Sequence, residues 1–63
     1  MEERIEIILD QYYKNSRPVI TDVKILDESL DSGIMCIRWR EEDTVITVKS
    51  IFTENEIIIT QLT

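Results

Sequence analysis

The stretch from residue 34 to residue 52, IMCIRWREEDTVITVKSIF, decides the fold. Apolar and polar side chains alternate on both sides of an acidic segment, which is the pattern of two β-strands joined as a hairpin. The pair Glu41-Glu42 is the expected turn, with strands over residues 34–40 and 44–52. A connection this short requires the two strands to run antiparallel.

One further strand is expected on each side of this hairpin. Residues 19–27 alternate in the same way, and a loop rich in turn-forming residues follows them and ends at Gly33. Beyond a second turn at Glu54-Asn55, residues 57–62 form the last strand. The sequence therefore predicts a four-stranded antiparallel meander.

Helical periodicity occurs only near the N-terminal end. Apolar residues recur there three or four positions apart, at Ile5, Ile8, Leu9, Tyr12 and Tyr13. This spacing predicts an amphipathic helix over about residues 2–14, which Asn15 can end in a left-handed conformation and which Pro18 cannot continue. The expected fold class is α+β: one N-terminal helix packed on a four-stranded antiparallel β-meander (αββββ), two layers in a single small domain of residues 1–63.

The turn positions fix which residues face one another across the strands. The expected pairs are Ile25 with Met35, Met35 with Val48, Ile37 with Ile46, Ser50 with Ile59, and Phe52 with Ile57. This register gathers a nearly continuous apolar face, on which the helix should pack. Its members are Val19, Val23, Ile25, Met35, Ile37, Trp39, Ile46, Val48, Phe52, Ile57 and Ile59.

The opposite sheet face has nothing to cover it, because one helix of about 13 residues is enough for roughly one face of a sheet about 19 Å wide. It combines apolar and basic side chains, with Asp22 as its only expected acid, opposite Arg38. Lys24 should lie beside Cys36. The residues of this face that we expect to bind a partner are Ile20, Lys24, Leu26, Ile34, Arg38, Arg40, Val45, Lys49, Ile51 and Ile58.

Composition argues against catalysis and cofactors. The chain has no histidine and one cysteine, which excludes a Ser-His-Asp triad, an imidazole metal site and a Cys-x-x-Cys motif. The loop from Asp27 to Gly33 has oxygen side chains at alternate positions, but its glycine and Arg38 stand where a calcium loop needs other residues. We expect no catalytic residue, metal, cofactor or small-molecule ligand, and a structural role for Cys36.

The net charge of −6 argues against direct nucleic-acid binding, and Trp39 between Arg38 and Arg40 is expected in the core. No run approaches the roughly 20 apolar residues that span a membrane, and the first residues are unlike a secretory signal. We therefore expect a cytoplasmic location.

An apolar patch without cover usually marks an interface. The expected function is that of a small non-catalytic protein that binds another protein, or a second copy of itself as a homodimer, through the uncovered face. Regulators and inhibitors of this kind include ones carried by bacteriophages or other mobile elements. A structural accessory subunit, or a face that solvent simply tolerates, is the alternative.

A second hypothesis uses the acidic side chains. Glu2, Glu6 and Asp10 stand four residues apart, in steps of roughly 6 Å along one side of the expected helix. With Glu41, Glu42 and Asp43 they could imitate nucleic-acid phosphates and block a DNA- or RNA-binding enzyme. The ordinary alternative is a solvated helix face, with Asp10 paired to Lys14.

Overall fold

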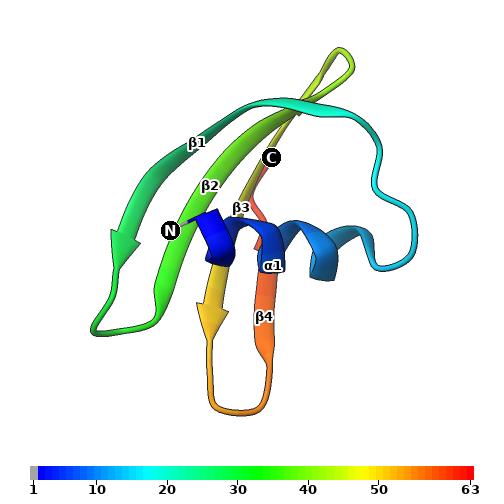
Figure 1. The fold of residues 1–63 in the computed structure, drawn as a ribbon. Helices are drawn as coiled ribbons and strands as arrows, with labels where there is room; N and C mark the ends of the chain where they lie inside the picture. Colours follow the sequence, from blue (N-terminus) through cyan, green and yellow to red (C-terminus); the bar gives the residue numbers. More distant parts are fainter. Residues whose placement is uncertain (1) are drawn as a thin grey trace.

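The computed structural model describes residues 2–63, without the side chain of Glu2, and its element order confirms the expected fold class (Figure 1). Four strands form one antiparallel sheet in the order β1-β2-β3-β4, and a single helix packs on one face of it. The predicted acidic role of Glu2 lies outside the described residues. The elements are α1 (Glu2–Tyr13), β1 (Ile20–Ser29), β2 (Ile34–Glu41), β3 (Thr44–Phe52) and β4 (Ile57–Gln61).

The apolar stripe of α1 faces the sheet, as its spacing predicts. Ile8 and Leu9 are buried, and Ile5 packs against the same core from a partly buried position. The helix ends one residue earlier than expected, because Lys14 rather than Asn15 takes the left-handed conformation, with φ 59°. The Lys14 N–H still donates to the Asp10 carbonyl at 2.7 Å, so the last turn remains closed.

Alternate residues of β2 and β3 supply the sheet side of the core. The buried side chains are Met35, Ile37, Trp39, Ile46 and Val48. This period of two confirms which face of these strands the helix covers. Ser50 continues the series, and its buried hydroxyl has no hydrogen-bond partner among the described residues.

Aromatic side chains join the end of the helix to the centre of β2. The Trp39 indole donates to the Tyr13 hydroxyl at 2.9 Å, and that hydroxyl donates to Glu41 Oε2 at 2.7 Å. The rings of Tyr12 and Tyr13 meet the Trp39 ring edge-on, at centroid distances of 5.2 and 6.1 Å. Burial and the hydrogen bond to Glu41 raise the pKa of Tyr13 to about 12.

The predicted register of β2 against β3 is wrong by two residues. Ile37 lies opposite Val48 instead of Ile46, and the turn is Glu42-Asp43, because Glu41 still belongs to β2. A shift of two preserves the direction of every side chain, so the covered face is unchanged. Between β3 and β4 the predicted pairs Phe52 with Ile57 and Ser50 with Ile59 are confirmed; β4 ends at Gln61 rather than residue 62.

Strand β1 departs further from the prediction, because two irregularities interrupt its pairing with β2. One lies between Thr21 and Lys24, where Asp22 has φ 56°, and the other between Ile25 and Asp27. Each irregularity changes the register, as a β-bulge does. Ile25 consequently lies opposite Ile37, not Met35, and the strand begins one residue later and ends two residues later than predicted.

The helix also leaves β1 uncovered on the side where an apolar core was expected. α1 contacts β4, whereas β1 lies at the opposite edge of the sheet (Figure 1). Val19, Val23 and Ile25 are therefore 84%, 36% and 41% exposed instead of buried. The covered part of the sheet is formed by β2, β3 and β4.

Any side chain at Gly33, in the turn between β1 and β2, should destabilise the protein. Its φ is +66°, and a Cβ there would lie 2.7 Å from the carbonyl oxygen of Phe52, whose N–H bonds to the Gly33 carbonyl at 2.8 Å. We expect Gly33→Ala to lower the free energy of unfolding by about 2 kcal/mol or more. Urea unfolding followed by Trp39 fluorescence measures this. Ser32→Ala, in the same turn, should change the midpoint little, and equal losses in both variants would refute the argument.

The raised pKa of Tyr13 should make the free energy of unfolding fall at alkaline pH. Its pKa is raised from 10.0 to about 12 in the folded state, so the folded protein keeps a proton that the unfolded chain releases. Stability from this group is therefore complete below pH 10 and is lost as the pH rises toward 12. Urea midpoints between pH 9 and about 12 should fall less steeply in Tyr13→Phe than in wild type. Tyr12→Phe keeps the Tyr13 hydroxyl with its bonds to Trp39 and Glu41, so its midpoints should fall more steeply than those of Tyr13→Phe.

Candidate interaction face

The sheet face turned away from α1 is the candidate site, and we refer to it as the uncovered face. Pairing across the strands arranges its side chains in rows, which mix apolar and basic groups. Of the residues predicted to bind a partner, eight lie on this face: Lys24, Ile34, Arg38, Arg40, Val45, Lys49, Ile51 and Ile58.

Three isoleucines form an apolar row at one end of the uncovered face. Ile34 on β2 lies opposite Ile51 on β3, which lies opposite Ile58 on β4. The row crosses two strand spacings, or about 10 Å. Ile34 and Ile51 are half-buried by their neighbours, and Ile58 is 43% exposed. These side chains offer a continuous apolar strip to a partner.

Basic side chains occupy the middle and the other end of the face. Lys24 on β1 lies directly opposite Arg38 on β2, and Lys49 lies opposite Cys36 in the neighbouring row. Like charges placed opposite one another across strands are destabilising. Among the described residues Lys24, Arg38 and Lys49 form no ion pair. The face therefore carries uncompensated positive charge in a protein whose net charge is −6.

Asp22 offsets part of this charge. It was predicted opposite Arg38, but the irregularity in β1 brings it to Arg40 instead, with Oδ2 3.6 Å from Nε. The Arg40 and Asp22 side chains are 48% and 70% exposed, which makes the pair weak. A hollow of about 220 Å³ opens here, lined by Asp22, Lys24, Arg38, Trp39, Arg40 and Val45.

Two predicted members of the face are placed differently. Ile20 pairs with Glu41 and packs against the core on the helix side, so its assignment to the uncovered face is wrong. Leu26 lies in the second irregularity of β1, where it is 48% exposed and has no partner in the ladder. That irregularity also puts Asp27, not Lys24, opposite Cys36, and so adds a second acid to this face.

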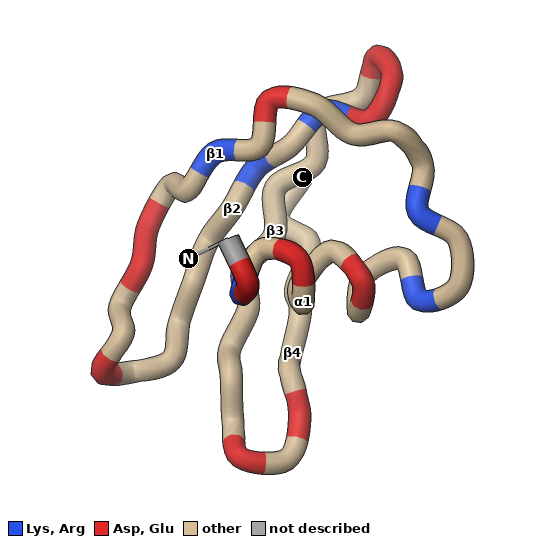
Figure 2. Tube along the Cα trace, in the orientation of Figure 1, with Lys and Arg blue, Asp and Glu red and all other residues tan. Residues whose placement is uncertain are grey.

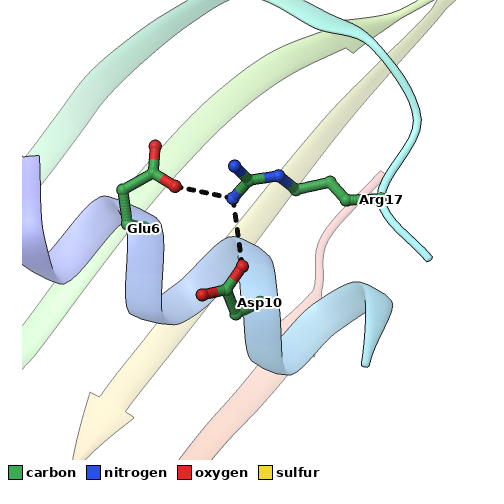
Figure 3. A network of polar contacts seen from close by, with 3 residues as sticks. All are labelled: Glu6, Asp10 and Arg17. Atoms are coloured by element: carbon green, nitrogen blue, oxygen red, sulfur yellow. Dashed lines mark hydrogen bonds and ion pairs between the residues drawn. The ribbon is translucent and has the colours of Figure 1, made fainter. Parts of the chain in front are cut away.

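The acidic surface is organised differently from the prediction. The Arg17 guanidinium contacts Glu6 Oε2 at 2.7 Å and Asp10 Oδ1 at 3.2 Å, so Asp10 pairs with Arg17 and not with Lys14 (Figure 3). The hydrogen bond that the Arg17 guanidinium donates to Glu6 raises the pKa of Arg17. One cation thus spans two carboxylates of the predicted acidic row.

The remaining acidic candidates lie in and beside the turn between β2 and β3. Glu42 and Asp43 are exposed at its tip, whereas Glu41 accepts the hydrogen bond from Tyr13 on the helix side. Acidic residues colour α1, the hairpin turns and two parts of β1, and basic residues colour neighbouring parts of β1 and β2 and the segment after α1 (Figure 2). Most of the basic residues of the strands lie on the uncovered face, together with Asp22 and Asp27.

A second apolar surface was missed by sequence reasoning. A groove of about 620 Å³ lies between α1 and β1, with Glu6 and Arg17 at its edge. One helix was expected to cover a whole face of the sheet, and this expectation was wrong for β1, because α1 lies toward β4 (Figure 1). The groove is lined by Ile5, Glu6, Leu9, Arg17, Pro18, Val19, Ile20 and Val23.

No family model, curated protein or solved structure matches this chain. Among the residues that the structure describes, no helix has both the length and the apolar character needed to cross a membrane. The same residues hold no group of three or more cysteine, aspartate or glutamate side chains placed for a metal ion.

Asp22→Asn should test the ion pair at the hollow. Asparagine tolerates a positive φ, so the substitution removes the charge and keeps the backbone. We expect a loss of about 0.5 kcal/mol in the free energy of unfolding at low salt and almost none at about 1 M salt. Urea unfolding at the two salt concentrations measures both values. Asp31→Asn in an exposed turn is the control, and a loss that salt leaves unchanged would contradict the ion-pair explanation.

Proposed function

We propose that this chain is a non-catalytic regulator or inhibitor that acts by binding an acidic region of another protein through its uncovered face. One observation carries the proposal: an apolar row across three strands lies beside three basic side chains that have no ion-pair partner among the described residues. An acidic partner would supply the missing counter-charge, and the isoleucine row would supply apolar contact.

The two parts of the face have different physical roles in this proposal. Fully burying an exposed isoleucine contributes about 1.5–3 kcal/mol, and Ile34, Ile51 and Ile58, which are already partly buried, can each contribute part of this to the affinity. Lys24, Arg38 and Lys49 favour an acidic partner, reject a basic one and orient the encounter. Four strands span about 19 Å, and strands of eight or nine residues are about 27 Å long, a size suited to a protein–protein contact.

A second copy fits the uncovered face less well than an acidic partner does. If two copies met face to face about a two-fold axis, each would bring the same excess of basic side chains to the contact. Like charges across an interface cost free energy, and each copy has only Asp22 and Asp27 on this face to offset them. The charge arrangement therefore favours a different protein over self-association through this surface.

The nucleic-acid mimic has less support than the uncovered face. Arg17 lies against both Glu6 and Asp10, which lowers the net negative charge of the row that would imitate phosphates. A phosphate mimic needs those carboxylates free to meet the basic groove of an enzyme. Binding through the acidic surface is the alternative that the following experiment can identify.

The test compares matched substitutions on two surfaces. Val45 and Val19 are both exposed, at 42% and 84%, but only Val45 lies on the uncovered face, opposite Arg40. We expect Val45→Asp to reduce capture of a partner from a lysate of the source cell by about tenfold or more, through lost apolar contact and added negative charge. Val19→Asp should leave capture unchanged. Quantitative mass spectrometry of the captured proteins gives the ratio for each variant.

Charge variants sharpen the same experiment. Asp22→Asn adds net positive charge to the face and should increase capture, whereas Arg38→Gln should decrease it. A variant in which Glu6 and Asp10 are both replaced by lysine tests the acidic surface. If that variant alone loses the captured protein while Val45→Asp keeps it, the uncovered face is not the binding surface and mimicry takes its place. Trp39 fluorescence shows that each variant is folded.

A further inference from the structure

The outer edge of β4 has no neighbouring strand in the sheet, although α1 packs over one face of this strand (Figure 1). The Leu62 N–H donates to the Thr47 carbonyl of β3 at 2.7 Å. Because backbone groups of a strand point to alternate sides, Ile58 and Thr60 also bond toward β3. Ile57, Ile59 and Gln61 therefore direct their N–H and C=O groups outward, where the sheet order places no further strand.

The two edges of the sheet differ in a way that points to pairing at β4. Natural sheets protect an edge with bulges, charged residues or proline. β1 has two irregularities and the charged residues Asp22, Lys24, Asp27 and Glu28. By contrast, β4 pairs with β3 without an irregularity, and residues 57–63 include no charged residue, proline or glycine. The β1 edge thus has features that prevent pairing with another strand, and the β4 edge lacks them.

We propose that β4 pairs with β4 of a second copy of this chain, antiparallel about a two-fold axis, to form a continuous eight-stranded sheet. The outward backbone groups match when Ile59 lies opposite its own counterpart and Ile57 opposite the counterpart of Gln61. No charged side chain then faces another in the paired strands. The basic residues of the uncovered face lie on β1, β2 and β3, so this contact avoids the repulsion that face-to-face stacking would produce.

A second copy is the occupant that the observations favour. The buried apolar core of the described residues comprises only Ile8, Leu9, Met35, Ile37, Trp39, Ile46 and Val48, and small domains of this kind gain stability from added burial on association. An isologous contact needs a self-complementary surface, which an uncharged strand meets. The pairing also joins the uncovered faces of two copies into one surface, yet it does not depend on what that surface binds.

Hydrogen exchange at individual amides tests the proposal without any substitution. The ladder amides of Ile58 and Thr60 should be protected at every protein concentration, because they bond within one copy. The outward amides of Ile57, Ile59 and Gln61 should slow by about tenfold when the protein concentration rises roughly a hundredfold, since the monomer fraction of a dimer falls with the square root of concentration. Fast exchange of all three at high concentration would overturn the proposal.

Light scattering after size exclusion supplies the second readout. Wild type should approach roughly 15 kDa, twice the 7.5 kDa chain, and dissociate on dilution. Gln61→Pro removes an outward N–H without breaking a bond to β3 and should give 7.5 kDa throughout. Thr63→Pro, the same change beyond the strand, should leave the dimer intact. A wild-type monomer, or a dimer that Gln61→Pro does not affect, contradicts pairing at β4 and leaves the proposed function of the uncovered face to its own test.

Discussion

The fully buried indole of Trp39 fixes where the helix can lie on the sheet. Its N–H donates a hydrogen bond to the Tyr13 hydroxyl at the last turn of α1, and this hydroxyl donates one to Glu41. Trp39, Tyr13 and Glu41 thus form a chain of hydrogen bonds that links the helix to β2 beside the apolar core. A buried indole N–H without an acceptor would cost about 1–3 kcal/mol. The helix therefore cannot slide along the sheet without losing this contact. Tyr12 also bonds to Gln61, which holds the same end of the helix over β4.

The position of the helix explains the behaviour of β1. A strand packed under a helix must keep a strict period of two, because a slip turns its apolar side chains outward. Since α1 lies toward β4, β1 is released from that requirement and carries two irregularities. They place Lys24 opposite Arg38, bring Asp22 to Arg40 and turn Ile20 to the helix side. The chemistry of the uncovered face thus follows from a helix that lies toward β4 and leaves β1 without cover (Figure 1).

The sequence was informative wherever packing enforces a period. Three features could be predicted: the apolar stripe of the helix, the buried face of β2 and β3, and the pairing of β3 with β4. In each of them a change of face would expose apolar side chains to solvent, which is unfavourable. The turn at Glu42-Asp43 was misplaced by one residue, which left the faces intact since the register moved by two. β1 could not be predicted, because nothing local marks Asp22 as a residue with positive φ. Ile20 was misassigned for that reason, and the partner of Cys36 because of the second irregularity, between Ile25 and Asp27. The isoleucine row and the basic residues kept their face.

The distribution of charge bears on how a protein of net charge −6 could approach the acidic partner that we propose for it. At long range the whole charge acts, and two acidic proteins repel one another at low salt. At physiological ionic strength the Debye length is about 8 Å, so at contact each group responds mainly to its neighbours. The local charges of the uncovered face then outweigh the distant acids of α1 and the turns, part of whose charge Arg17 already offsets. A positive face on an acidic molecule thereby discourages non-specific adhesion of basic surfaces and still permits one oriented contact with an acidic one.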